Sequence, residues 1–272
     1  MVYSEDYKKL LNAKAYAGKY YEIDERVEEI CKEAFKGCDK LEEIVMPKKL
    51  KKIDSEAFRG CSGLTELTLP NSVASIGDSA FEYCSGLTEL TLPNSVKSIG
   101  DGAFADCSGL KKITVESGNS RYDSRDNCNS IIDKKTNTLI VGCKNSIIPN
   151  SVTSIGSGAF AYCSGLTELT LPNSVTSIGN GAFGGCSGLT ELTLPNSVTS
   201  IGDAAFSECS GLSKITSLAG IPPVFDRCMF VGEEFDGVNK TNCELIVPEG
   251  SVAAYTRAED WNKFSNIRGF SK

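Results

Sequence analysis

Hydrophobic residues recur along most of this chain with a fixed period. The string CSGLTELTLPNSV occurs unaltered four times, beginning at Cys61, Cys84, Cys163 and Cys186. An Ala-Phe pair closes each unit and places a phenylalanine at Phe35, Phe58, Phe81, Phe104, Phe160, Phe183 and Phe206. Successive phenylalanines are 23 residues apart except for one interval of 56, so one unit is ten residues longer than the others. A fixed period of this kind indicates a repeat architecture.

Within one unit, the polar and apolar positions predict a short strand followed by turns. Leu67 and Leu69 would lie on one face of the strand, with Glu66 and Thr68 on the other. Residues 70–72, Pro-Asn-Ser, end the strand. The Ala-Phe pair fits one turn of 3₁₀ or α-helix, with the phenylalanine between layers. One unit cannot bury its apolar side alone, so copies must stack with parallel strands ~4.8 Å apart.

A period of 23 residues falls in the leucine-rich-repeat range. We therefore predict a right-handed leucine-rich-repeat solenoid that is β-rich, with parallel strands, short helical or 3₁₀ turns, a helical N-terminal cap and a strand-helix C-terminal cap. We expect one structural domain, divided into a capping helix within residues 1–22, repeats over 23–217 with a hairpin insertion at about 116–147, and a cap over 218–272.

The repeat weakens toward the N-terminus. Ile23, Val27, Ile30 and the pair at 34–35 match apolar positions of the full unit, so a half-unit precedes the first complete one. Before it, residues 4–17 are interpreted as a polar helix that shields the end of the stack. Ser4 would be its N-cap, and one side would carry Tyr7, Leu10, Leu11 and Ala15.

Residues beyond the last repeat, and those inside the long unit, predict further elements. Residues 243–248 predict a strand and residues 251–258 a short helix, followed by Trp261, Phe264 and Ile267, spaced to seal the last layer. In the long unit, residues 130–133 and 138–141 predict a β-hairpin around a polar turn.

The composition restricts the function. The 272 residues include 28 Lys and Arg against 35 Asp and Glu, giving a net charge of −7, and the chain has no histidine. An acidic chain is a poor partner for nucleic acid, and the lack of imidazole removes His-dependent catalysis. No segment is long and apolar enough for membrane insertion. Residues 1–9 are too polar for a signal peptide, so we expect either a cytoplasmic protein or a leader outside this sequence.

The 12 cysteines fall into two groups. One position of the repeat holds Cys38, Cys61, Cys84, Cys107, Cys163, Cys186 and Cys209. We predict a column of buried thiols there, because parallel side chains suit neither a disulfide nor a metal ion. The other cysteines leave two disulfides open, Cys128–Cys143 in the insertion and Cys228–Cys243 in the cap. We expect no metal and no cofactor.

The outward positions of the strands form the candidate binding face. They are Glu43, Glu66, Thr68, Glu89, Thr91, Lys112, Thr114, Glu168, Thr170, Glu191, Thr193, Lys214 and Thr216. This mostly acidic stripe beside threonines is either a surface for basic or hydroxylated ligands or a soluble face copied by duplication. The lysines Lys48, Lys49, Lys51, Lys52, Lys97, Lys111 and Lys112 are interpreted as a solvated rim.

The unit CSGLTELTLPNSVTSIGxxAF resembles the repeat of the BspA-like (Treponema pallidum type) leucine-rich-repeat proteins, over about Ile23 to Ile215. The resemblance implies a secreted or cell-surface protein of host-associated bacteria that binds host or extracellular-matrix proteins. We therefore expect non-catalytic adhesion or recognition of a protein or glycoconjugate through the concave face of a monomer.

Two other functions stay open. One is a structural spacer or self-associating surface scaffold. The other is an enzyme whose carboxylate pair would combine Glu116 or Asp133 with Asp123 or Asp126 in the insertion.

Overall fold

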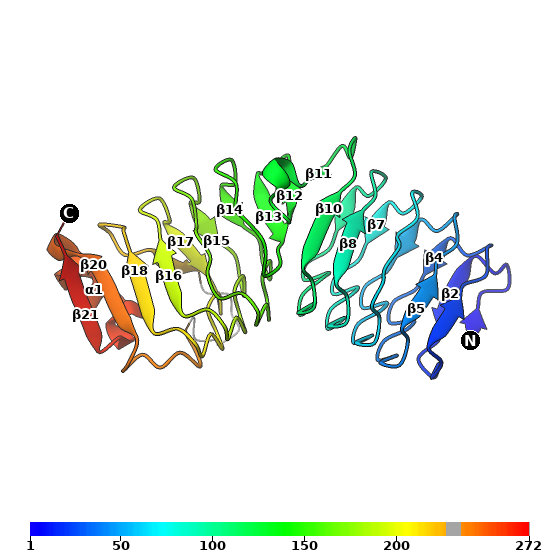
Figure 1. Ribbon diagram of the computed structural model, residues 1–272, viewed down its shortest axis with the longest axis horizontal. Helices are drawn as coiled ribbons and strands as arrows, with labels where there is room; N and C mark the ends of the chain where they lie inside the picture. Colours follow the sequence, from blue (N-terminus) through cyan, green and yellow to red (C-terminus); the bar gives the residue numbers. More distant parts are fainter. Residues whose placement is uncertain (227–234, 272) are drawn as a thin grey trace. The chain divides into compact units, whose positions relative to one another are not determined.

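A computed structural model describes residues 1–226 and 235–271 of the chain. These residues divide into two compact units. Unit 1 consists of Met1–Lys135 and Val141–Asn145, and unit 2 consists of Thr136–Ile140 and Ser146–Lys272. Both units are built from short, mostly parallel strands, and each turn of the chain adds one layer to the unit (Figure 1). The predicted β-rich leucine-rich-repeat solenoid is confirmed.

Unit 1 holds two kinds of strand, which we call short strands and long strands. The short-strand sheet, in spatial order, is β1 (Val2–Tyr3), β2 (Lys9–Asn12), β4 (Glu29–Ile30), β6 (Lys52–Ile53), β7 (Ser75–Ile76) and β9 (Ser98–Ile99). The long strands are β3 (Tyr20–Glu22) paired with β5 (Glu43–Val45), and β8 (Glu89–Leu92) paired with β10 (Lys112–Val115). The insertion adds β11 (Tyr122–Asp123), the 3₁₀ turn η1 (Arg125–Asn127) and β12 (Ile131–Asp133).

Unit 2 repeats this arrangement. Its short strands, in spatial order, are β13 (Thr138–Val141), β14 (Ser154–Ile155), β15 (Ser177–Ile178), β17 (Ser200–Gly202) and β19 (Val224–Asp226). Its long strands are β16 (Glu191–Leu194), β18 (Lys214–Ser217), β20 (Glu244–Pro248) and β21 (Asn266–Phe270). The cap also contains η2 (Glu249–Ser251), α1 (Val252–Arg257) and η3 (Trp261–Lys263).

The apolar positions of the repeat form the core. Leu64 and Val73 are fully buried and Ile76 is 2% exposed, and equivalent residues are buried in the other layers. Burying one such side chain contributes about 1.5–3 kcal/mol. The layers are close enough to require glycine at fixed places, because a Cβ on Gly63 would lie 2.4 Å from the Asp39 carbonyl oxygen of the preceding layer.

The closing turn of each unit differs from the predicted helical turn. Alternate backbone N–H groups donate to the next layer rather than within a helix, as from Phe58 to the Ala80 carbonyl at 2.8 Å. Other residues of the turn have left-handed φ angles, including 56° at Glu56 and 62° at Tyr83. The turn therefore forms a third row of hydrogen bonds between layers, besides those of the short strands and the long strands, and bonds to the neighbouring layer replace the intrahelical bonds of a helical turn.

The phenylalanines that close the units stack in columns. In unit 1 the rings of Phe35, Phe58, Phe81 and Phe104 follow one another at centroid distances of 5.0, 5.1 and 5.2 Å. In unit 2 the rings of Phe160, Phe183, Phe206 and Phe235 are spaced by 5.3, 5.5 and 5.5 Å. The interplanar angles are 11° or less, so each ring fills the space between two layers, as the sequence predicts.

The predicted N-terminal capping helix within residues 1–22 is wrong. Strands β1 and β2 pair antiparallel there, and β2 continues the parallel ladder by placing Leu10 beside Ile30. Leu10 is fully buried, whereas Leu11 is 40% exposed and Tyr7 has a φ of 58°. One buried residue can join the ladder but cannot form a helical stripe, so packing against the next layer overrides the local helical pattern.

The predicted strand and helix of the C-terminal cap and the two predicted strands of the insertion are present in the structure. Strand β20 and helix α1 lie where the sequence predicts a strand and a short helix. Trp261 is fully buried and Phe264 is 3% exposed, so both seal the last layer. Strands β12 and β13 match the two predicted hairpin strands. Residues Thr138 and Leu139 of β13 pair in parallel with Ser154 and Ile155, so this strand is itself a short strand of unit 2.

Candidate functional site

The outward residues predicted for the long strands lie on the surface, as the alternation predicts. The predicted strand is wrong in two layers, because residues 66–69 form no strand and residues 168–171 form only a single bridge, from Thr170 to Thr193. In each unit we call the exposed row of these outward residues the Glu/Thr face. Of the thirteen candidate residues named above, Lys214 and Thr216 are half-buried and the others are exposed. Between them, Leu67 and Leu90 are 7% and 1% exposed. The parallel pairing of β8 with β10 places Lys112 beside Glu89 and Thr114 beside Thr91, so equivalent side chains of the face are aligned in rows across the strands.

Charges along the face are only partly paired. Lys112 lies 3.2 Å from Glu89 in unit 1, and Lys214 lies 3.2 Å from Glu191 in unit 2. Lys112 and Glu89 are 62% and 63% exposed, so such a pair contributes little stability. Within residues 1–226 and 235–271, the face residues Glu66 and Glu168 form no ion pair. Each face therefore presents unneutralised carboxylate to solvent.

The lysine-rich first unit forms a solvated rim with acidic partners in the neighbouring layer. Lys52 Nζ lies 3.0 Å from Glu29 and 3.1 Å from Asp54, and Lys51 pairs with Glu28. The pairs with Glu28 and Glu29 join successive layers, whereas Lys52 and Asp54 lie in the same layer. Two of the four lysines of this cluster, Lys51 and Lys52, thus have acidic partners, while Lys48 and Lys49 are exposed.

The cysteine column is a ladder of buried thiols that donate to the preceding layer. Sγ of Cys61 lies 3.1 Å from the Phe35 carbonyl oxygen. The same bond, at 3.0–3.2 Å, joins Cys84 to Phe58, Cys107 to Phe81, Cys186 to Phe160 and Cys209 to Phe183. Burial raises the pKa of Cys61 to about 12. These thiols are structural donors rather than nucleophiles.

The two disulfides left open by the sequence have different outcomes. The described cysteines are all thiols, and these include Cys128 and Cys143 of the insertion, so the Cys128–Cys143 disulfide is not formed. The Asn129 side-chain amide lies 3.2 Å from Cys143 Sγ, which occupies the space near that thiol. Cys228 lies outside the described residues.

Three of the four candidate carboxylates of the insertion have hydrogen-bond or ion-pair partners of their own. Asp133 is 6% exposed and accepts two hydrogen bonds from Arg121, at 2.6 and 3.0 Å. Asp123 pairs with Arg125 at 2.9 Å, and Glu116 accepts the Asn94 backbone N–H at 3.1 Å. Each of these three carboxylates is held by a different donor, and the fourth candidate, Asp126, is exposed.

The structure shows a polar hollow in unit 1 that the sequence does not predict. We call it the insert hollow, and it has a volume of about 550 Å³ beside β10. Its lining includes Lys111, Lys112, Thr114, Asn127 and Asn145. The residues come from one long strand and from two segments of the insertion that are distant along the chain. Only the cluster of polar residues after β10 hints at it in the sequence.

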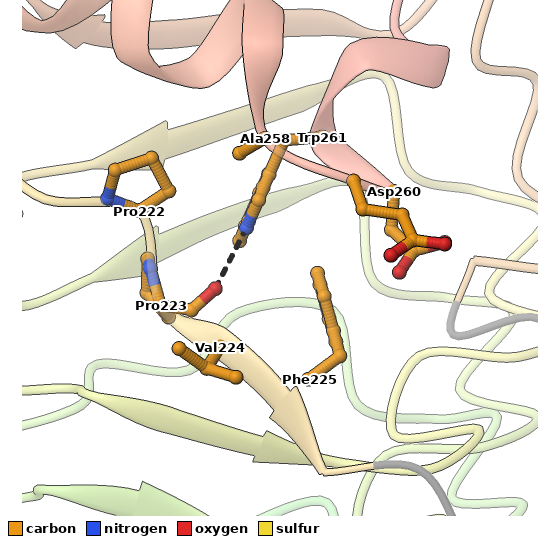
Figure 2. A pocket seen from close by; sticks show the side chains of 8 residues that line it. Pro222, Pro223, Val224, Phe225, Ala258, Asp260 and Trp261 are labelled. Carbon is orange, nitrogen blue, oxygen red and sulfur yellow. Dashed lines mark hydrogen bonds between the residues drawn. The ribbon is translucent and has the colours of Figure 1, made fainter.

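A second cavity, of about 290 Å³, lies in the C-terminal cap (Figure 2). Its wall includes Pro222, Phe225 and Trp261, and the Trp261 indole N–H donates to the Pro223 carbonyl at 3.0 Å. Asp260 points toward this region but pairs with Lys263 at 3.0 Å. The polar groups are thus used inside the cap, whose aromatic residues cover the last layer.

Within residues 1–226 and 235–271, no three His, Cys, Asp or Glu side chains are placed to hold a metal ion together. Over the same ranges, no helix has the length and apolar character that crossing a membrane requires.

The stacked layers, the parallel long strands and the buried Leu-x-Leu positions define a leucine-rich-repeat solenoid. The model of the BspA type leucine rich repeat region matches residues 14–132 and 130–230, with six copies. The chain therefore belongs to this family. No curated protein matches the chain.

Solved structures share the fold. A leucine-rich repeat protein from Eubacterium ventriosum matches with a TM-score of 0.72 and 21% identity, over 97% of this chain and 70% of that chain. One from Bacteroides ovatus matches with a TM-score of 0.62 and 26% identity, over 94% of this chain and 63% of that chain. The pneumococcal vaccine antigen PcpA matches with a TM-score of 0.53 and 22% identity, over 96% of this chain and 81% of that chain.

Proposed function

We propose that this protein is a non-catalytic binding protein, secreted or held at the cell surface, and that its Glu/Thr faces recognise a protein or glycoconjugate. The observation that carries the proposal is the face itself. Polar side chains project at equivalent positions of successive layers, and the pairing of β8 with β10 and of β16 with β18 holds them in fixed register above buried leucines such as Leu90 and Leu192. Such a surface offers a ligand the same polar groups once per layer, about 4.8 Å apart.

The chemistry of the face favours a partner with basic or hydroxylated groups. Glu66 and Glu168 are exposed and form no ion pair within the described residues, and the threonine beside each can donate and accept hydrogen bonds. One exposed carboxylate contributes little to binding, but several in a row act together if the ligand spans the layers. Recognition then depends on shape and on many weak polar contacts.

Two parts of the proposal, the lack of catalysis and the location outside the cell, are supported by different observations. Three of the insertion carboxylates are held by separate donors and the column thiols are buried, which supports the proposal that the protein is not a catalyst. The surface location rests on the family resemblance, since binding extracellular partners requires exposure outside the cell.

A binding screen with a multiple variant tests the proposal. The variant Glu66→Gln, Glu89→Gln, Glu168→Gln, Glu191→Gln removes four face carboxylates while keeping their size. The matched control replaces four exposed carboxylates away from the face, Glu5→Gln, Glu25→Gln, Asp101→Asn and Glu208→Gln. Both variants and the wild type are applied to immobilised matrix proteins, host-cell proteins and glycans.

We expect the wild type and the control to bind at least one ligand and the face variant to lose at least tenfold in affinity, which is about 1.4 kcal/mol. Equal binding by the face variant and the control would contradict the role of the face. Binding of no ligand, together with concentration-dependent light scattering of the wild type, would instead favour the self-associating scaffold.

A further inference from the structure

The insert hollow lies where the regular ladder of long strands in unit 1 ends. Strand β10 pairs with β8 on one side. On its other side, side chains of the insertion take the place of a strand. The Ile113 N–H donates to the Asn129 side-chain oxygen at 2.6 Å, and the Val115 N–H donates to Ser124 Oγ at 2.9 Å.

These bonds close the β10 edge to strand addition. A peptide that extended the sheet would need the Ile113 and Val115 N–H groups, and both already have acceptors. The Lys111 carbonyl is also used, because the side-chain amides of Asn129 and Asn145 donate to it at 2.8 and 3.1 Å. The hollow is therefore bordered by a strand edge whose hydrogen-bonding groups are already used, and it is not an open sheet edge.

Several polar groups at the hollow remain available for a ligand. Within the described residues, Lys111 forms no ion pair and the Asn127 side-chain amide forms no hydrogen bond. Lys111, Thr114, Asn127 and Asn145 are exposed. Since Asn145 uses its amide nitrogen on Lys111, its side-chain oxygen is left to accept. No Asp or Glu lines the hollow.

The sequence changes its charge at this layer. Four units carry Thr-Glu at the same position of the repeat, at 65–66, 88–89, 167–168 and 190–191. The layer that borders the hollow has Lys111 and Lys112 instead. Lys112 forms an ion pair with Glu89, whereas Lys111 forms no ion pair within the described residues. A positive site thus interrupts an otherwise acidic face.

We propose that the insert hollow binds an acidic saccharide, with the ligand's carboxylate at Lys111 and Lys112 and its hydroxyls at Asn127, Asn145 and Thr114. Ammonium groups bind carboxylates, while amides and hydroxyls match the alternating donors and acceptors of a sugar ring. The volume of about 550 Å³ falls within the range of ligand pockets, ≈ 300–1,000 Å³. The closed β10 edge favours a saccharide over an acidic peptide added as a strand. The inference goes beyond the proposed function, because it assigns a second site with the opposite charge preference beside the Glu/Thr face of unit 1.

Isothermal titration with trigalacturonate tests the site. Its methyl-esterified form keeps the rings and removes the charges, and a hexaglutamate peptide supplies the charge without the sugar. The variants are Lys111→Gln, which removes the unpaired ammonium, and Asn127→Gly, which removes the amide but tolerates the φ of 52°. Lys97→Gln is the matched control, since Lys97 is an exposed lysine that does not line the hollow.

We expect trigalacturonate to bind the wild type and Lys97→Gln equally, and Lys111→Gln and the esterified trimer each to reduce affinity about tenfold. Asn127→Gly should weaken both trimers. No binding of trigalacturonate, or equal binding by Lys111→Gln and Lys97→Gln, would overturn the site. Equal or tighter binding of hexaglutamate would overturn the saccharide assignment. None of these results depends on Glu66 or Glu168, so the face proposal would survive them.

Discussion

Removal of one ring from the phenylalanine column should loosen the layers on either side of it. Phe81 is fully buried, and its ring stacks on Phe58 at 5.1 Å and on Phe104 at 5.2 Å. A buried Phe→Ala substitution costs about 3–5 kcal/mol, and each lost ring pair adds about 0.5–1.5 kcal/mol. With two ring pairs lost, Phe81→Ala should therefore cost about 4–8 kcal/mol. Phe81→Leu is the milder variant if Phe81→Ala fails to fold.

Native-state hydrogen exchange read by mass spectrometry measures this cost layer by layer. In a solenoid each layer contacts its neighbours, so the loss should be local. We expect faster exchange in peptides that contain Phe58, Phe81 and Phe104, and unchanged exchange around Phe183 in unit 2. Tyr83→Ala is the matched control, because Tyr83 lies in the same turn but is 37% exposed. An equal loss of protection in both units, or an equal effect of Tyr83→Ala, would refute the reasoning.

Three further predictions concern single side chains. Gly86→Ala should lower the free energy of unfolding by more than about 3 kcal/mol, because its Cβ would lie 2.5 Å from the Ser62 carbonyl oxygen. Gly102→Ala has space for its Cβ and should lower it by only about 1–2 kcal/mol, for its φ of 61°. Equal losses in thermal unfolding would contradict the close approach of the layers. Burial and, to a lesser extent, the charge of Glu82 raise the pKa of the Asp106 carboxyl from 3.8 to about 6, so ionisation of Asp106 above pH 4 destabilises the folded state. Asp106→Asn should therefore raise the melting temperature at pH 7.5 but not at pH 3.5. A gain at both pH values would contradict this cause. Cys61 should stay unreactive toward a thiol reagent at pH 8 until the protein is unfolded, because burial raises its pKa to about 12, and rapid labelling of the native protein would show that the column is open.

Much of the layer is predictable from one unit of sequence. The alternation at Leu67 and Leu69 predicts which side chains are buried, and the positions of Glu66 and Thr68 predict the exposed face. The C-terminal strand and helix follow from local patterns in the same way. Periodicity is a reliable signal here because every unit meets nearly the same neighbours.

Features that depend on contacts between layers are not predictable in this way. The Ala-Phe turn has local i to i−3 spacing, yet half of its N–H groups bond to the next layer. The N-terminal segment has a helical pattern, yet Leu10 gains more by extending the ladder beside Ile30. The insert hollow combines Lys111, Asn127 and Asn145, which become neighbours only after the insertion folds back on β10.

Carboxyl footprinting in the bound state tests the role of the faces most directly. The protein is labelled with a carbodiimide and an amine, alone and with the partner that the binding screen identifies. We predict that the partner protects Glu66 or Glu168 from labelling, while Glu25, which is exposed away from the faces, is labelled equally in both samples. Unchanged labelling of Glu66, Glu89, Glu168 and Glu191 under saturating partner would contradict the claim that the Glu/Thr faces bind the ligand.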